Sequence, residues 1–140
     1  MYTFRKAGDR YFLSIDNHQE IASALTEFCK AEAITAGEIY GLGAVNDVVL
    51  RFFSPVTKKY VDMAFKEQME MTNLTGNISE MNGNAYLHLH ATFGKSDCSA
   101  IGGHLLTAVV SGACELVVIP SEAHLERKFS AETGLNMYEF

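Results

Sequence analysis

Apolar and polar residues alternate in short runs along most of this sequence, which is typical of β-strands that bury one face. Turn-forming residues separate the runs: Gly8-Asp9, Asn46-Asp47, Ser54-Pro55 and Asn82-Gly83. The pattern predicts strands over 1–6, 10–15, 38–45, 48–53, 60–65, 68–74, 76–79, 84–93 and 114–119.

One segment near the N-terminus follows a helical period instead. Its apolar positions recur three, four, seven and eight residues after the first and form one stripe: Ile21, Ala24, Leu25, Phe28 and Cys29. Asp16 or Asn17 is positioned to cap this helix, which we expect to end between Ala33 and Gly37. The predicted fold class is α+β, with one main helix packed on a largely antiparallel sheet of about six to seven strands.

The run 84–93 carries two histidines on the face opposite its apolar residues. Ala85, Leu87, Leu89, Ala91 and Phe93 form the apolar face, and Tyr86, His88, His90 and Thr92 form the other. The polar segment 95–99 predicts a turn about Asp97. Such a hairpin pairs His90 with His104, because each lies seven positions from Asp97.

Three imidazoles on one strand face are a typical donor set for a transition metal. We therefore expect His88, His90 and His104 to bind a divalent ion, with zinc first and iron or nickel as alternatives. A coordination position would stay open for water or another ligand. Gly102-Gly103 could introduce a bulge that turns His104 to the opposite face.

Two further features concern the surroundings of this hairpin. Leu106, Ala108 and Val110 continue the His104 face if the alternation holds, which predicts an apolar surface that a second subunit would cover. Glu70 lies inside a predicted strand and is a weak candidate for a general base.

Composition and charge narrow the function classes. A chain of 140 residues predicts a single domain over 1–140, with its core in about 10–120 and a C-terminal tail over 121–140. The net charge of −6 argues against broad neutralisation of nucleic-acid phosphates. Three cysteines without C-x-x-C spacing indicate reduced thiols in the cytoplasm, and no apolar run predicts a membrane span.

The order of these features resembles the PPC domain family, named for its presence in plants and prokaryotes. Four pieces carry the likeness: Gly41-Leu-Gly43-Ala44 after the helix, Glu67 to Ile78, His88-Leu-His90, and Gly102-Gly103-His104-Leu105. The resemblance implies a PPC-like fold, a homotrimer and a role in DNA binding, and it carries the three histidines over as a metal triad. Plant relatives contact DNA through a separate hook with an Arg-Gly-Arg-Pro core, and this core does not occur here.

The expected function is therefore a cytosolic homotrimeric PPC-domain protein, similar to stand-alone prokaryotic members, with a three-histidine metal site and a DNA-binding or regulatory role. A metal-dependent enzyme of hydrolase or lyase type is one alternative. A small-molecule sensor that uses the open coordination position is another.

Overall fold

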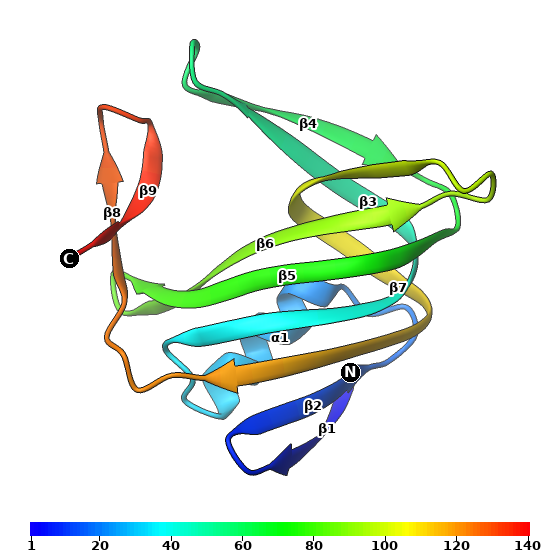
Figure 1. Cartoon of the computed structure of the whole chain (residues 1–140), viewed down its shortest axis with the longest axis horizontal. Helices are drawn as coiled ribbons and strands as arrows, with labels where there is room; N and C mark the ends of the chain where they lie inside the picture. Colours follow the sequence, from blue (N-terminus) through cyan, green and yellow to red (C-terminus); the bar gives the residue numbers. More distant parts are fainter.

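Nine strands and one helix make up most of the protein, and the computed structural model describes all 140 residues (Figure 1). The elements are β1 (Tyr2–Ala7), β2 (Arg10–Ile15), α1 (Ile21–Ala31), β3 (Gly37–Ser54), β4 (Lys59–Phe65), β5 (Met69–Met81), β6 (Asn84–Gly94), β7 (Ala100–Pro120), β8 (Glu126–Ser130) and β9 (Leu135–Glu139). The expected six to seven strands are corrected to nine, because the C-terminal tail folds into β8 and β9.

All nine strands join in one sheet with the order β1-β2-β7-β3-β5-β8-β9. β4 pairs with β3, while β6 pairs with β5 along one edge and with β7 along the other. Strands β3, β5, β6 and β7 therefore form a closed ring of backbone pairings, which protects their edges from unwanted association.

β3 is one long strand, although the sequence predicts two strands separated by a turn at Asn46-Asp47. Its pairing with β7 shifts between Val45 and Asp47, so Asn46 is accommodated as an irregularity in the ladder. A β-bulge bends a strand without ending it, and the polar pair therefore marks a bend. The same correction applies to β5, which runs unbroken through the two predicted segments 68–74 and 76–79.

The helix α1 begins after Glu20, not after Asp16 or Asn17. The Glu20 carboxylate accepts hydrogen bonds from the backbone N–H groups of Ala22 (2.9 Å) and Ser23 (2.7 Å). It also accepts from the N–H of Ala108 on β7 at 3.0 Å, and thereby ties the helix start to the sheet. Glu20 therefore caps the helix, a role that the shorter side chains of Ser, Thr, Asp and Asn fill more often.

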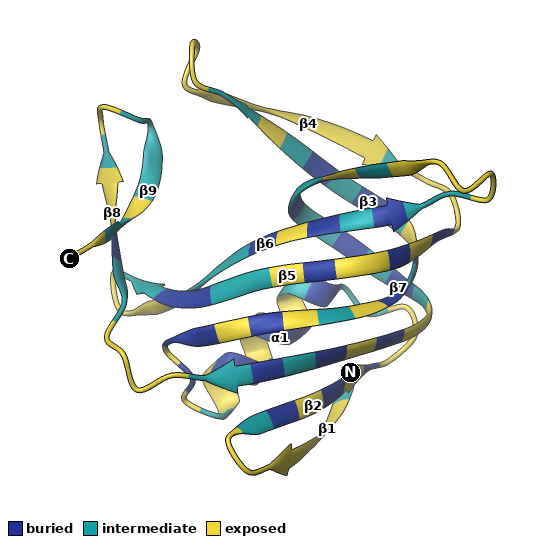
Figure 2. Cartoon of the chain, viewed as in Figure 1, coloured by how far each residue is buried: buried dark blue, intermediate teal, exposed yellow.

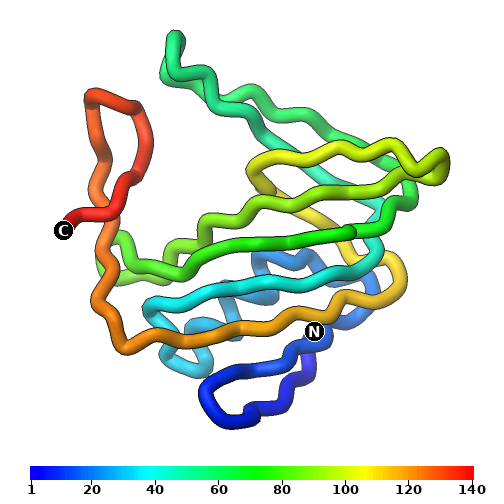
Figure 3. Tube along the Cα trace, viewed as in Figure 1, coloured from blue at the N-terminus to red at the C-terminus, as the bar shows by residue number.

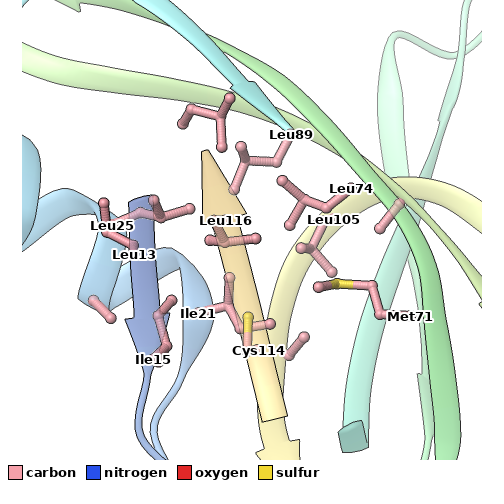
Figure 4. Packing of buried hydrophobic residues seen from close by; sticks show 14 of the residues in the cluster. Leu13, Ile15, Ile21, Leu25, Met71, Leu74, Leu89, Leu105, Cys114 and Leu116 are labelled. Carbon is pink, nitrogen blue, oxygen red and sulfur yellow. The ribbon is translucent and has the colours of Figure 1, made fainter. Parts of the chain in front are cut away.

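The apolar stripe of α1 packs on the inner face of the sheet (Figure 4). Leu25, Phe28 and Cys29 are fully buried, and they belong to one core cluster with side chains from β2, β5, β6 and β7. Figure 2 shows the alternation of buried and exposed residues along β3, β5 and β7 that this single-sided packing produces.

The C-terminal tail expected over 121–140 forms the β8–β9 hairpin. Figure 3 traces it in orange and red at one edge of the sheet, away from the blue N-terminal hairpin. One parallel bridge between Glu80 and Glu126 and a hydrogen bond from the Glu80 N–H to the Leu125 carbonyl (2.8 Å) join its base to β5. No helix in the protein is long and apolar enough to cross a membrane.

Candidate metal centre

The β6–β7 hairpin brings the three predicted histidines together. His90 pairs directly with His104, as the turn about Asp97 predicted. The Asp97 carboxylate fixes that turn by accepting hydrogen bonds from the Ser99 backbone N–H (2.9 Å) and hydroxyl (2.6 Å). The glycines at 102 and 103 pair in regular register, so no bulge separates His104 from its partner.

The imidazole rings face one another on the outer side of the sheet. Their centroids are 5.1 Å apart for His88 and His90, 5.2 Å for His88 and His104, and 5.4 Å for His90 and His104. One ring nitrogen from each histidine lies within 4.8 Å of the other two. Three nitrogen donors converging from one rigid hairpin fit the donor set of a zinc-type ion with an open position.

The surroundings favour the neutral form of two of these imidazoles. Burial lowers the pKa of His104 to about 4, with further contributions from His88, His90 and Arg51. Burial also lowers the pKa of His88, assisted by His90 and Arg127. Neutral imidazole is the form that binds a metal ion, so the site is ready to coordinate at neutral pH.

The histidines lie in a cavity of about 500 Å³ between the β6–β7 hairpin, the β3–β4 hairpin and the β8–β9 hairpin. The last two hairpins touch at their ends, where Lys58 Nζ donates a hydrogen bond to the Ala131 carbonyl at 2.7 Å. Aromatic and cationic side chains line the cavity beside the histidines: Phe52, Phe53, Tyr60, Tyr86 and Tyr138, with Arg51 and Arg127. No aspartate or glutamate lines it.

Arg51 and Tyr60 form the wall next to His104. The Arg51 guanidinium donates two hydrogen bonds of 2.9 Å to the Asp62 carboxylate and lies 4.7 Å from the centre of the Tyr60 ring. The Tyr60 ring centre is 5.9 Å from that of His104. The charge of Arg51 is therefore balanced by Asp62, which lies outside the cavity lining.

Arg127 forms the wall on the side of His88 and was not predicted from the sequence. Its side chain donates hydrogen bonds of 2.8 Å to the Ser79 hydroxyl, the Asn77 side-chain oxygen and the Asn136 carbonyl. Its guanidinium lies 4.9 Å from the centre of the Tyr86 ring and 4.3 Å from that of Tyr138. The only sequence signal was that this arginine lies in a tail with several aromatic residues. The partners of Arg127 on β5 and β6 are distant from it along the chain.

The predicted apolar continuation of the His104 face is wrong. The pairing of β7 with β3 shifts between the partners of Leu105 and Thr107, and this irregularity reverses the alternation at Leu106. Ala108 and Val110 consequently point inward and are fully buried in the core. Leu106 is only partly exposed, so these residues do not make an outer apolar surface.

Glu70 is exposed on β5 and does not line the histidine cavity. The carboxylate residue Glu38 pairs with Asn77, which pairs with His88 on the next strand. It lines a neighbouring hollow of about 420 Å³ together with His88 and His90. The structure thus brings Glu38, rather than Glu70, to the side of the histidines.

A family profile described as the Plants and Prokaryotes Conserved (PCC) domain matches residues 2–122, most of the chain. The chain belongs to this family. The PCC profile covers β1 to β7, including all three histidines, and ends before β8 and β9. The β8–β9 wall of the cavity therefore lies outside the matched region.

Solved structures show the same PCC architecture. A candidate DNA-binding protein from Bacteroides thetaiotaomicron is 51% identical, with a TM-score of 0.98, and the alignment covers 100% of this chain and 98% of that one. A metal-containing protein from Archaeoglobus fulgidus is 31% identical, with a TM-score of 0.89 and coverage of 100% and 99%.

A plant- and prokaryote-conserved (PPC) protein from Pyrococcus horikoshii is 26% identical, with a TM-score of 0.87 and coverage of 100% and 95%. No protein with a curated description matches this chain. These likenesses establish the fold and the family, and they include one relative that is described as containing a metal.

Proposed function

We propose that this PCC-domain protein binds one divalent transition-metal ion per chain through His88, His90 and His104. Zinc is the first choice, with iron or nickel as alternatives, because imidazole nitrogen suits all three. The observation that carries the proposal is the convergence of three ring nitrogens within 4.8 Å on a paired β-hairpin. The archaeal relative described as metal-containing supports it.

The chain's own residues would hold and shield such an ion. The β6–β7 backbone ladder fixes the separation of His90 and His104, and the lowered pKa values of His88 and His104 keep both rings in the ligand form. Bound there, the ion would supply Lewis acidity to a ligand in its open position. Aromatic side chains around the cavity would limit the access of bulk water.

Elemental analysis of protein loaded with Zn²⁺ and then desalted tests the metal site. We expect about one zinc ion per chain in the natural sequence and clearly less in His90→Ala, because the loss of one of three ligands should weaken binding by at least about tenfold. His18→Ala is the matched control, since His18 is an exposed histidine outside the cluster. Equal metal content in all three proteins would contradict the proposal.

We also propose a homotrimer, on the basis of an apolar row across the outer sheet face. Phe12 pairs with Val117, Val117 with Tyr40, and Tyr40 with Thr75, which pairs with His90. Phe12 and Tyr40 are 47% and 43% exposed, and their neighbour Leu42 is 55% exposed. Large apolar side chains on a sheet face favour coverage by another subunit.

Sedimentation equilibrium tests the assembly. We expect a species of three times the 15.4 kDa chain mass, and a smaller species for Leu42→Asp, because a carboxylate would be buried in the contact. Val56→Asp serves as the control, since Val56 is 91% exposed in the β3–β4 turn. A natural chain that sediments as a monomer would contradict the proposed trimer.

DNA binding is a second candidate function, and the description of the Bacteroides relative supports it. The net charge of −6 opposes it, because phosphate contacts need clustered lysine and arginine. If this candidate is correct, we expect the metal-loaded protein to be retained on duplex DNA at low salt and released as the salt concentration rises. A protein that passes through unretained would contradict this candidate.

The open coordination position supports two further roles, a small-molecule sensor and a metal-dependent hydrolase or lyase. The cavity favours the first, since it is roomy and aromatic and contains no carboxylate that could act as a general base. For an enzyme, Glu70 stays a weak candidate, and Glu38 lies closer along the sheet. Equal turnover by Glu38→Gln, Glu70→Gln and the natural chain would remove both as bases.

A cytoplasmic location is part of the proposal, in keeping with the free thiols of Cys29, Cys98 and Cys114.

A further inference from the structure

Arg127 is the only charged side chain that is buried in this protein. It is 8% exposed, and its hydrogen-bond partner Ser79 is the other buried polar residue. Arg127 takes part in none of the chain's ion pairs, whereas Arg51 on the opposite wall pairs with Asp62. Burying a charge without a counterion is costly, so this cation calls for an explanation.

The neutral partners of Arg127 leave part of its donor capacity free. A guanidinium group carries five N–H donors, and three hydrogen bonds hold it to Ser79, Asn77 and Asn136. Two N–H donors therefore have no partner in the protein. The side chain lines the histidine cavity, and Tyr86 and Tyr138 fix its plane there.

The charged side chains that line the cavity are both positive: Arg51 and Arg127. Arg127 lies close enough to His88 to act on it electrostatically, and no carboxylate lines the space between them. A divalent ion on the three histidines would add to this positive potential. Arg51 is balanced by Asp62, so the uncompensated charge is that of Arg127, and in a protein of net charge −6 it favours an anionic ligand beside the metal.

We propose that the cavity is a binding site for a small organic carboxylate with an aromatic or other apolar body. The free N–H donors of the Arg127 guanidinium can form charge-assisted hydrogen bonds to a carboxylate, and they contribute the anion contact beside the metal. The aromatic side chains of the β3–β4 and β8–β9 hairpins would pack on the body of the ligand. This inference rests on the proposed metal site for the second anchor of the carboxylate.

Benzoate is the probe, because it combines a carboxylate with an aromatic ring and fits a cavity of about 500 Å³. Isothermal titration of the zinc-loaded protein with benzoate measures the interaction. Benzamide, which has the same shape without the charge, and inorganic phosphate, which has charge without the apolar body, are titrated in parallel. We expect benzoate to bind at least about tenfold more tightly than either.

Asn77→Asp is the decisive variant. The Asn77 side-chain oxygen already accepts a hydrogen bond from Arg127 at 2.8 Å, so aspartate keeps that bond and adds the missing counterion. We expect a thermal midpoint at or above that of the natural chain, together with benzoate binding weakened at least about tenfold. Asn73→Asp is the matched control, since it makes the same change on the same strand outside the cavity lining.

The outcomes separate the anion site from the metal site. Benzoate binding that is lost in Asn77→Asp and kept in Asn73→Asp supports the inference. Binding that is equal in both variants and the natural chain, absent throughout, or matched by benzamide or phosphate overturns it. If the chain takes up no zinc, the proposed metal site fails, and the same titrations of metal-free protein then decide the carboxylate site alone.

Discussion

Two walls of the histidine cavity are built in different ways. The β6–β7 wall is held by regular backbone pairing to β5 and β3, and its histidines are fixed by that ladder. The β8–β9 wall joins β5 by one parallel bridge, by the backbone hydrogen bond from Glu80 to Leu125 and by two side-chain hydrogen bonds from Arg127, and Lys58 of the β3–β4 hairpin holds its tip. The first wall is therefore part of the scaffold, while the second is held by a few hydrogen bonds, of which Arg127 supplies two to β5.

This difference indicates how the two walls would serve function. Metal ligands need fixed geometry, which a continuous strand ladder provides. A wall attached by few contacts opens more readily than a core strand, so the β8–β9 hairpin is the element best suited to admit and enclose a ligand. Changes to each wall should therefore have separable effects.

The largest effect should follow from Arg127→Met. This change removes three hydrogen bonds and two cation–π contacts, and we expect the free energy of unfolding to fall by about 2–5 kcal/mol. Amide hydrogen exchange should rise selectively over 126–139, with zinc content unchanged. Arg10→Met, at an exposed pair with Asp9, should have little effect. Uniform loss of protection across the sheet would show that the two walls are not separable.

Gly76→Ala should disturb the other wall. An added Cβ at position 76 would lie 2.4 Å from Leu89 Cδ2 and 2.7 Å from the His88 carbonyl oxygen, so β5 and β6 must move apart. We expect a loss of about 1–3 kcal/mol in stability and weaker zinc binding. Gly94→Ala, where the nearest atom is 3.4 Å away, should bind zinc normally. Normal zinc binding by Gly76→Ala would contradict the claim that this ladder sets the ligand geometry.

The metal-free protein should lose stability in acid. Burial lowers the pKa of His104 to about 4 from an unfolded value of 6.5, so the unfolded chain binds more protons between these values. Stability should be full above pH 6.5 and fall as the pH drops toward 4. Because His104 is only half-buried, we expect on the order of 1 kcal/mol. Urea unfolding at pH 7.5 and pH 5 measures this, and His104→Gln should reduce the difference. An unchanged pH dependence in that variant would contradict the assignment.

The smallest effect concerns the thiols. Burial raises the pKa of Cys29 and of Cys114 to about 12, whereas Cys98 is exposed in the β6–β7 turn. One thiol per chain should therefore react with a disulfide reagent at pH 8, and all three should react after unfolding. Cys98→Ser should abolish the fast reaction without changing zinc content. Loss of zinc in this variant would place sulfur in the metal site.

The β6–β7 hairpin could be predicted from the sequence because its information is local. A short turn about Asp97 and strict alternation determine which residues pair, and the structure confirms the pairing of His90 with His104. The strand ends and the facing of some residues could not be predicted in this way. An irregularity at Asn46 lets β3 continue past the expected turn, and one at Leu106 reverses the alternation in β7. One extra residue in a ladder leaves no clear sign in composition.

The opposite wall could not be predicted from the sequence for a physical reason. The hairpin β8–β9 acquires its position from contacts between Arg127 and residues 48 and 50 positions earlier, Ser79 and Asn77. Periodicity describes how a segment buries its own face, and it contains no information about one long side chain reaching another strand. The cationic character of the cavity emerged only from the three-dimensional arrangement.

X-ray absorption spectroscopy of the zinc-loaded protein tests the central claim most directly. The three-histidine site predicts nitrogen ligands at about 2.0–2.1 Å with the outer-shell pattern of imidazole rings, and no sulfur ligand. That imidazole signal should disappear when His88, His90 and His104 are all changed to alanine. A zinc–sulfur distance of about 2.3 Å, or a spectrum unaltered in the triple variant, would contradict the account.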